Sequence, residues 1–232
     1  MILKVKQIEI FKMMEINKGV IFDLDGVIVD TAKFHFLAWR KLANDLGFDF
    51  TEEQNEQLKG VSREDSLKKI LDWGELELSK TEFKRQMTLK NENYLSYVAK
   101  MDEDEILPGV QKVLDYLIDN NVPFALGSAS KNARNILKKI NLLDEFDAIV
   151  DGTDVSKAKP DPEVFLIAAE KLNIKPENSI VFEDSVAGVQ AANNANMISI
   201  GIGAQKTLGE ADYVFTDFTE INIEFIKKLL TK

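Results

Sequence analysis

The chain lacks cysteine, a long apolar run and a recognisable leader peptide, and each absence excludes a class of protein. Without cysteine there are neither disulfides nor thiolate metal sites, and nothing in the composition indicates export. No apolar run approaches the roughly 18 residues that a membrane-spanning helix needs. Lysines and Glu9 interrupt the apolar residues near the N-terminus, and no small-residue cleavage site follows. We therefore expect a cytoplasmic protein without a membrane partner.

An excess of basic residues is also absent. The net charge is −10, whereas proteins that bind nucleic acid usually present a basic face, so we expect no nucleic-acid partner. Residues 31–101 hold 12 basic and 12 acidic residues, so the whole excess lies in the rest of the chain. Most of these acids are expected to serve solubility. An acidic protein that binds phosphate would need a cation, and a divalent metal is the natural choice.

Short apolar runs alternate with helical patterns along most of the chain. The apolar runs are Gly19–Phe22, Phe124–Gly127, Ala148–Val150, Ile180–Phe182, Ile198–Ile202 and the weaker Tyr213–Phe215. The helical patterns between them are Val110–Asn120, Lys131–Ile140, Pro162–Leu172 and Val186–Asn194. This alternation predicts an α/β fold, a Rossmann-like parallel sheet with helices on both faces. Ligands in such sheets bind at the carboxyl ends of the strands.

Residues 32–101 break this alternation, because they show helical spacing throughout and no convincing strand. We interpret them as an all-helical cap domain inserted after the first strand. The core domain is then formed by residues 1–31 and 102–232. Residues 1–17 precede the first strand as an extension or a start-site artefact, and we assign them no function.

Two carboxylates follow the first apolar run directly. Asp23 and Asp25 flank Leu24, and Gly26 permits a tight turn. A carboxylate at a strand end can attack a phosphoryl group, and a second one nearby can move the proton as general acid or base. The structural alternative is a capped turn with both acids solvated. An EF-hand loop is excluded, because Val27 stands where that loop needs Asp or Asn.

Two further segments offer phosphate ligands. Ser128 follows the second apolar run, and Lys131 and Asn132 begin the next helical pattern, where an anion binds readily. The alternative is that Ser128 or Ser130 simply caps that helix. Lys159 lies in the proline-flanked segment KAKPDP, from which it can neutralise both a nucleophilic aspartate and a phosphate. A solvated loop lysine is the ordinary alternative.

Glu183 and Asp184 are adjacent acids at the end of the apolar run SIVF. Like charges at a buried strand end repel unless a cation lies between them, so the pair indicates a Mg²⁺ site. The alternative is a helix cap formed by Asp184 or Ser185, which leaves Glu183 unexplained.

The predicted cap supplies three further candidates. Arg63, in the segment GVSRED, is a candidate bidentate phosphate ligand, although Ser62 and Asp65 also have the spacing of a capping box. His35 is the only histidine of the chain and on its own would more often be a packing residue. Trp39 lies one helical turn further on, as core or as pocket wall.

Together, these motifs resemble the haloacid dehalogenase superfamily of phosphotransferases. The second aspartate and the helical cap are similar to its phosphatase and mutase branch. The match extends to the β-phosphoglucomutase family, and the segments that carry it are DLDGVIVDTAKFHFLAW, KGVSREDSL, KNENY, LGSASKN, KAKPDP and FEDSVAGVQAA. GVSRED and the helix with Thr31, His35 and Trp39 are far more specific than the superfamily motifs.

The resemblance implies a role for each matching residue. Asp23 would be the nucleophile and Asp25 the general acid/base. Mg²⁺ would bind Asp23, Glu183, Asp184 and the backbone carbonyl of Asp25. The residues implied to bind the substrate or its phosphates are Thr31, His35, Trp39, Lys59, Gly60, Val61, Ser62, Arg63, Lys90, Ser128, Ala129, Ser130, Lys131, Asn132 and Lys159.

The activity implied is the interconversion of β-D-glucose 1-phosphate and D-glucose 6-phosphate. It would proceed through β-glucose 1,6-bisphosphate and an aspartyl-phosphate enzyme, in a monomer that binds only small sugar phosphates. The alternative is a sugar-phosphate phosphatase on the same scaffold, which needs no anchor such as Arg63 for a second phosphate. A signalling receiver domain is discounted, because receivers have only about half this length and no helical insertion.

Overall fold

The structure is a computed structural model that describes residues 18–59 and 61–231. Residues 1–17, interpreted as an extension, lie outside the described residues. Gly60, predicted to line the sugar pocket, lies outside them too.

Six short strands form one parallel sheet in the order β3-β2-β1-β4-β5-β6. The strands are β1 (Gly19–Phe22), β2 (Phe124–Gly127), β3 (Ala148–Val150), β4 (Ser179–Glu183), β5 (Ile198–Ile202) and β6 (Tyr213–Phe215). Every residue of β1, β2 and β4 is buried, as the continuous apolar runs require of strands covered on both faces. Strands β2 and β3 extend the sheet on one side of β1, and β4, β5 and β6 extend it on the other. β1 therefore lies at the centre of the sheet, between β2 and β4.

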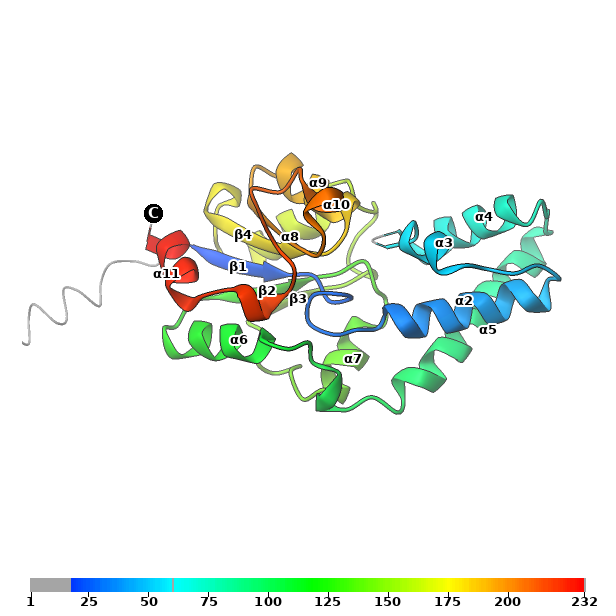
Figure 1. Ribbon diagram of the computed structural model, residues 1–232, viewed down its shortest axis with the longest axis horizontal. Coiled ribbons are helices and arrows are strands. Elements are labelled where there is room, and N and C mark those ends of the chain that lie inside the picture. The colour runs from blue at the N-terminus through cyan, green and yellow to red at the C-terminus, as the bar shows by residue number, and fades with distance from the viewer. Residues whose placement is uncertain (1–17, 60, 232) are drawn as a thin grey trace, which may run out of the picture.

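Helices cover both faces of the sheet (Figure 1). One face carries α6 (Val110–Asp119), α7 (Ala133–Lys139) and α11 (Ile223–Thr231), whose apolar residues join the larger core cluster. The other carries α8 (Glu163–Lys171) and α9 (Val186–Asn194), with α10 (Gln205–Leu208) packed beside α9. The short helices η1 (Glu103–Glu105), η2 (Pro176–Asn178) and η3 (Phe218–Glu220) lie in connections.

The cap is formed by the four helices that follow β1, and it stands beyond the carboxyl ends of the strands (Figure 1). Its helices are α2 (Ala32–Asp45), α3 (Glu52–Glu56), α4 (Arg63–Trp73) and α5 (Lys80–Val98). The cap has its own apolar cluster, which includes Trp39, Phe50 and Leu67. Within the described part of the chain, no helix combines the length and the apolar content needed to cross a bilayer.

The predicted α/β core with an inserted helical cap is confirmed. Five of the six strands have the predicted bounds, and β4 is one residue longer at each end. The predicted helix Lys131–Ile140 begins only at Ala133, because the hydroxyls of Ser128 and Ser130 bind the backbone N–H groups of Ser130 and Asn132 in the preceding loop.

Candidate active site

The carboxyl ends of the central strands bring the motif acids together. Phe22 of β1 lies in register with Phe182 of β4, and the Asp23 N–H donates to the Phe182 carbonyl at 2.9 Å. Asp23 and Glu183 therefore follow the same level of the sheet on neighbouring strands. Glu183 is 1% exposed and Asp23 6% exposed, so both carboxylates are held away from bulk water.

The cluster of Asp23, Glu183 and Asp184 fits a divalent cation. One ligand oxygen from each carboxylate lies within 4.8 Å of the other two. Mg²⁺ prefers such oxygen ligands and uses few protein carboxylates, the rest of its shell being water or phosphate. Asp25 does not belong to this side-chain cluster, so its predicted contribution depends on its backbone carbonyl and stays a prediction.

Lysines neutralise the cluster from two sides. Lys159 Nζ lies 2.6 Å from Asp23 Oδ1 and 3.0 Å from Glu183 Oε2, and Lys59 Nζ lies 3.3 Å from Asp184 Oδ2. Burial acts to lower the pKa of Lys159, but the Asp23 and Glu183 carboxylates raise it overall above its usual value. Burial raises the pKa of both Glu183 and Asp184, and the charge of Asp23 adds to the effect. A bound cation would reduce the repulsion between these buried carboxylates.

Two further residues shape this cluster. Gly26 has a φ of +81°, and a Cβ there would lie 2.1 Å from Asp184 Oδ2, so only glycine permits the turn beside that carboxylate. Ser185, and not Asp184, caps α9, since the Ser185 hydroxyl accepts from the Gly188 N–H at 3.0 Å. The helix-cap interpretation of Asp184 is therefore wrong, and its carboxylate is available to the site.

Asp25 is held by Thr31, the residue directly before the first cap helix. The Thr31 hydroxyl, fully buried, donates a short hydrogen bond to Asp25 Oδ1. Burial and the nearby charge of Asp23 raise the pKa of Asp25 to about 6. A carboxyl group with such a pKa exchanges its proton near neutral pH, which suits a general acid/base.

The loop after β2 presents the second predicted segment. The Ser128 hydroxyl is buried and accepts from the Ser130 N–H at 3.1 Å. Asn132 precedes α7, and its side-chain amide donates to Asn91 Oδ1 of the cap at 3.0 Å. Lys131 makes no side-chain hydrogen bond or ion pair with any residue in 18–59 or 61–231.

The loop that carries Lys159 is fixed by the first residue of α8. The Glu163 carboxylate accepts from the Ser156 N–H at 2.8 Å and from the Lys157 N–H at 2.6 Å. These bonds hold both ends of the short segment between Ser156 and α8. The ammonium group of Lys159 is thereby directed at Asp23, as the segment KAKPDP predicts.

Lys90 organises the cap wall that faces Asp25. Its Nζ lies 2.9 Å from His35 Nδ1, 4.3 Å from the centroid of the Trp39 ring and 4.9 Å from that of Tyr94. Burial and the positive charge of Arg63 lower the pKa of Lys90. Burial and the charge of Lys90 lower the pKa of His35, which favours the neutral imidazole beside the Lys90 amine.

The segment GVSRED enters the site at the start of α4. Ser62 caps this helix, its hydroxyl accepting from the Asp65 N–H at 3.2 Å. The Asp65 carboxylate binds the Ser62 hydroxyl and not its backbone N–H, so the complete capping box is not formed. Arg63 is half-buried and makes no hydrogen bond or ion pair with any described residue.

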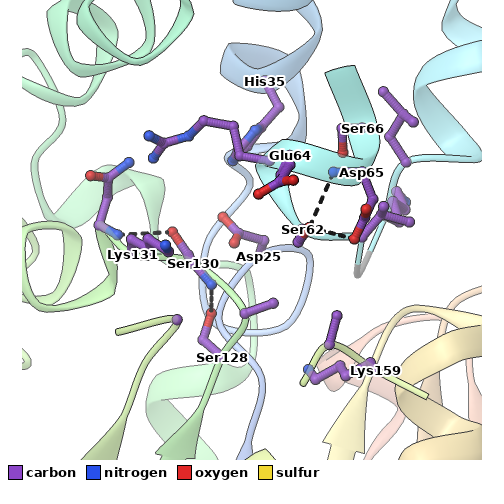
Figure 2. A pocket seen from close by; sticks show the side chains of 18 of the residues that line it. Asp25, His35, Ser62, Glu64, Asp65, Ser66, Ser128, Ser130, Lys131 and Lys159 are labelled. Carbon is purple, nitrogen blue, oxygen red and sulfur yellow. Dashed lines mark hydrogen bonds between the residues drawn. The ribbon is translucent and has the colours of Figure 1, made fainter. Parts of the chain in front are cut away.

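A cavity of about 520 Å³ between the cap and the core unites these groups. Figure 2 shows Ser128, Ser130 and Lys131 on the core side, Ser62 and Ser66 on the cap side, and Asp25 between them. Of the predicted residues, those that line the cavity are Asp23, Asp25, His35, Trp39, Lys59, Val61, Ser62, Arg63, Lys90, Ser128, Ala129, Ser130, Lys131, Asn132, Lys159 and Asp184. Thr31 and Glu183 lie behind this surface and contact it through Asp25 and Lys159.

Asn55, Ser66 and Asn91 are among the residues at the site that the sequence did not predict. Asn55 and Ser66 line the cavity, and Asn91 binds Asn132 across the cap–core boundary. Ser66 lies one helical turn after Ser62, so both residues lie on the same side of α4. This spacing from a predicted site residue could have identified Ser66 in the sequence. Asn91 follows Lys90 directly, and no pattern in the sequence distinguishes it from its neighbours.

The family model for the haloacid dehalogenase-like hydrolases matches residues 20–202. The chain belongs to the haloacid dehalogenase-like hydrolase family. Within this family it is 40% identical to a β-phosphoglucomutase of Bacillus subtilis (strain 168) over 211 residues, 90% of this chain and 93% of the relative. It is 33% identical to a phosphorylated carbohydrates phosphatase of Thermotoga maritima over 182 residues, 78% and 82% of the two chains.

A crystal structure of β-phosphoglucomutase from Clostridium difficile has the same fold, with a TM-score of 0.88 and 41% identity. The match covers 92% of this chain and 96% of the other. Mutases and phosphatases of the haloacid dehalogenase-like family thus share this scaffold, so the family alone does not fix the reaction.

Proposed function

We propose that this protein is a Mg²⁺-dependent β-phosphoglucomutase that interconverts β-D-glucose 1-phosphate and D-glucose 6-phosphate. The observation that carries the proposal is the half-buried Arg63, which faces the cavity without a carboxylate partner among the described residues. A guanidinium held in this way suits a second phosphate, which a mutase intermediate has and a simple phosphate ester lacks. The likeness to β-phosphoglucomutases over about nine tenths of the chain supports it.

The nucleophile in this proposal is Asp23. Its carboxylate attacks the C1 phosphorus of β-glucose 1,6-bisphosphate, the bond from that phosphorus to the C1 oxygen breaks, and Asp25 gives its proton to that oxygen, which releases glucose 6-phosphate. In the second half, Asp25 takes the proton from the 6-hydroxyl of a molecule of β-glucose 1-phosphate. That oxygen attacks the aspartyl phosphate, and the Asp23 carboxylate leaves. Thr31, which donates to Asp25, holds the acid/base in place.

The phosphates would be held from both domains. Lys159, Ser128 and the Ala129 backbone surround the transferring phosphate, and Arg63, Lys131 and Asn132 bind the distal one. When bound by Asp23, Glu183, Asp184 and the Asp25 carbonyl, Mg²⁺ would supply positive charge that stabilises the phosphoryl group in the transition state.

The test is the conversion of β-glucose 1-phosphate with Mg²⁺ and a catalytic amount of glucose 1,6-bisphosphate. We expect glucose 6-phosphate to accumulate from the β anomer and not from α-glucose 1-phosphate. If neither anomer yields glucose 6-phosphate, the protein is not this mutase. The second candidate function is that of a sugar-phosphate phosphatase, and the observation that supports it is the sequence identity to the Thermotoga maritima phosphatase.

A further inference from the structure

Asn55 is a buried polar residue that the mechanism above does not use. The residue is 8% exposed, and it lines the cavity. The backbone of Asn55 is satisfied, since its N–H donates to the Thr51 carbonyl and its carbonyl accepts from the Leu58 N–H. The carboxamide, by contrast, makes no hydrogen bond with any residue in 18–59 or 61–231. Buried carboxamides almost always have a partner, so this one points to a ligand.

The position of this carboxamide is fixed by the fold of the cap. Thr51 and Gln54 close a complete capping box around the start of α3, directly before Asn55. Leu58, which follows, packs into the apolar cluster of the cap with Phe50 and Trp39. The backbone of Asn55 is therefore held in place at the cavity wall by its own helix.

The chemistry of the wall indicates which part of a substrate Asn55 meets. Cationic residues that line the same cavity, among them Arg63, Lys131 and Lys159, provide for the negative charge of the substrate. A carboxamide is neutral and offers a donor and an acceptor side by side, which matches a hydroxyl group that both donates and accepts. Ser66, a second buried hydroxyl on the same cavity, likewise makes no side-chain hydrogen bond with the described residues.

We propose that Asn55 is a specificity-determining residue that hydrogen-bonds to one ring hydroxyl of the sugar phosphate. This inference rests on the proposed function only in taking the substrate to be a sugar phosphate. In this proposal, α3 of the cap recognises a hydroxyl group of the sugar ring, while other residues bind the phosphates. A site built to bind a hydroxyl rejects analogues that lack it, because its own polar group is then left unpaired.

The test compares Asn55→Leu with the wild-type protein. Because the carboxamide has no partner within the described chain, we expect the melting temperature to stay unchanged. For glucose 6-phosphate, kcat/KM should fall about three- to ten-fold, the usual effect of one lost neutral hydrogen bond. Gln57→Leu is the matched control: it removes a carboxamide from the same segment that is exposed and does not line the cavity, and it should change neither quantity.

Three monodeoxy analogues, 2-, 3- and 4-deoxyglucose 6-phosphate, identify the hydroxyl. For the analogue that lacks it, wild type and Asn55→Leu should have equal kcat/KM, whereas the other two should show the full difference. Equal activity of the two proteins on glucose 6-phosphate would overturn the inference. So would the same loss on all three analogues, or a fall in melting temperature shared by Asn55→Leu and Asn55→Ala.

The experiment separates this inference from the proposed function. The ratio of kcat/KM values is measured on total turnover, whether glucose 6-phosphate yields β-glucose 1-phosphate or free phosphate. If only phosphate appears, the mutase assignment fails while the analogue series still tests Asn55. If isomerisation occurs and the series shows no dependence on one hydroxyl, the inference on Asn55 fails alone.

Discussion

The Lys59 ammonium of the cap lies 3.3 Å from the Asp184 carboxylate of the core. The Asp184 side chain is 8% exposed and the Lys59 side chain 30% exposed, so the pair is partly shielded from water. Burial acts to lower the pKa of Lys59, and Asp184 raises it overall above its usual value. One cation from the cap thus already lies beside the acidic cluster in which we place Mg²⁺.

Lys59 should therefore compete with Mg²⁺ for Asp184 in the substrate-free protein. We expect Lys59→Met to lower the dissociation constant of Mg²⁺ by roughly two- to five-fold, the range of a partly exposed ion pair. Isothermal titration of Mg²⁺ into the protein measures it. Lys69→Met, which removes the same charge from an exposed position of α4, is the control. Equal dissociation constants for the two variants would contradict the competition.

Asp23→Asn should abolish turnover while the fold persists. The substitution removes the nucleophile, but Lys159 keeps Glu183 as an ion-pair partner at 3.0 Å, so the buried ammonium is not left without a carboxylate. Circular dichroism and the rate of glucose 6-phosphate formation check the two parts. A variant that turns over at a rate comparable to that of wild type would refute the assignment of Asp23.

Arg63→Ala should weaken mutase activity more than the hydrolysis of a small phosphate ester. The guanidinium is expected to meet only the distal phosphate, which p-nitrophenyl phosphate lacks. A charge-assisted hydrogen bond of about 1.5–3 kcal/mol corresponds to roughly a ten- to hundred-fold loss of kcat/KM for the sugar phosphate. Both rates are measured on the same preparation. If they fall by the same factor, Arg63 has a structural role and anchors no phosphate.

His35 should stay neutral in the folded protein at physiological pH. Burial and the charges of Lys90 and Arg63 hold its pKa well below 6.5. Because the sequence contains one histidine, the imidazole NMR signal of an untagged protein needs no assignment. Its chemical shift should be flat between roughly pH 6 and 8 and titrate near 6.5 only in unfolding concentrations of urea.

The sign of the linked stability follows from that lowered pKa. Below pH 6.5, His35 binds a proton in the unfolded chain but stays neutral in the folded protein. Its contribution to the free energy of unfolding is therefore complete above pH 6.5 and decreases as the pH falls below that value. A folded-state titration with a midpoint at or above 6.5 would contradict the burial of the Lys90–His35 pair.

The sheet could be predicted from the sequence because its buried strands are continuous apolar runs. The strand that deviates is β4, which includes Glu183 although an acid normally ends such a run. Glu183 pairs with Gly201 of β5 and is stabilised by Lys159, a residue 24 positions earlier in the chain. That compensation is a tertiary contact, so no local pattern could reveal it.

The site could be predicted on its core side and only in part on its cap side. The acids after β1 and β4 converge because parallel strands end at one edge, a rule that needs only the fold class. The pairing of Lys59 with Asp184 and of Asn91 with Asn132 depends on how the cap stands over the core. Asn55 was missed for the same reason, because α3 has only five residues and no apolar periodicity that marks its face.

The most direct test of the account is the partition of the aspartyl phosphate between sugar and water. β-Glucose 1-phosphate is supplied with Mg²⁺ and catalytic glucose 1,6-bisphosphate, and glucose 6-phosphate and inorganic phosphate are followed in the same reaction. We expect glucose 6-phosphate to form with only trace release of phosphate. Phosphate released in proportion to the substrate consumed would contradict it and identify the protein as a phosphatase.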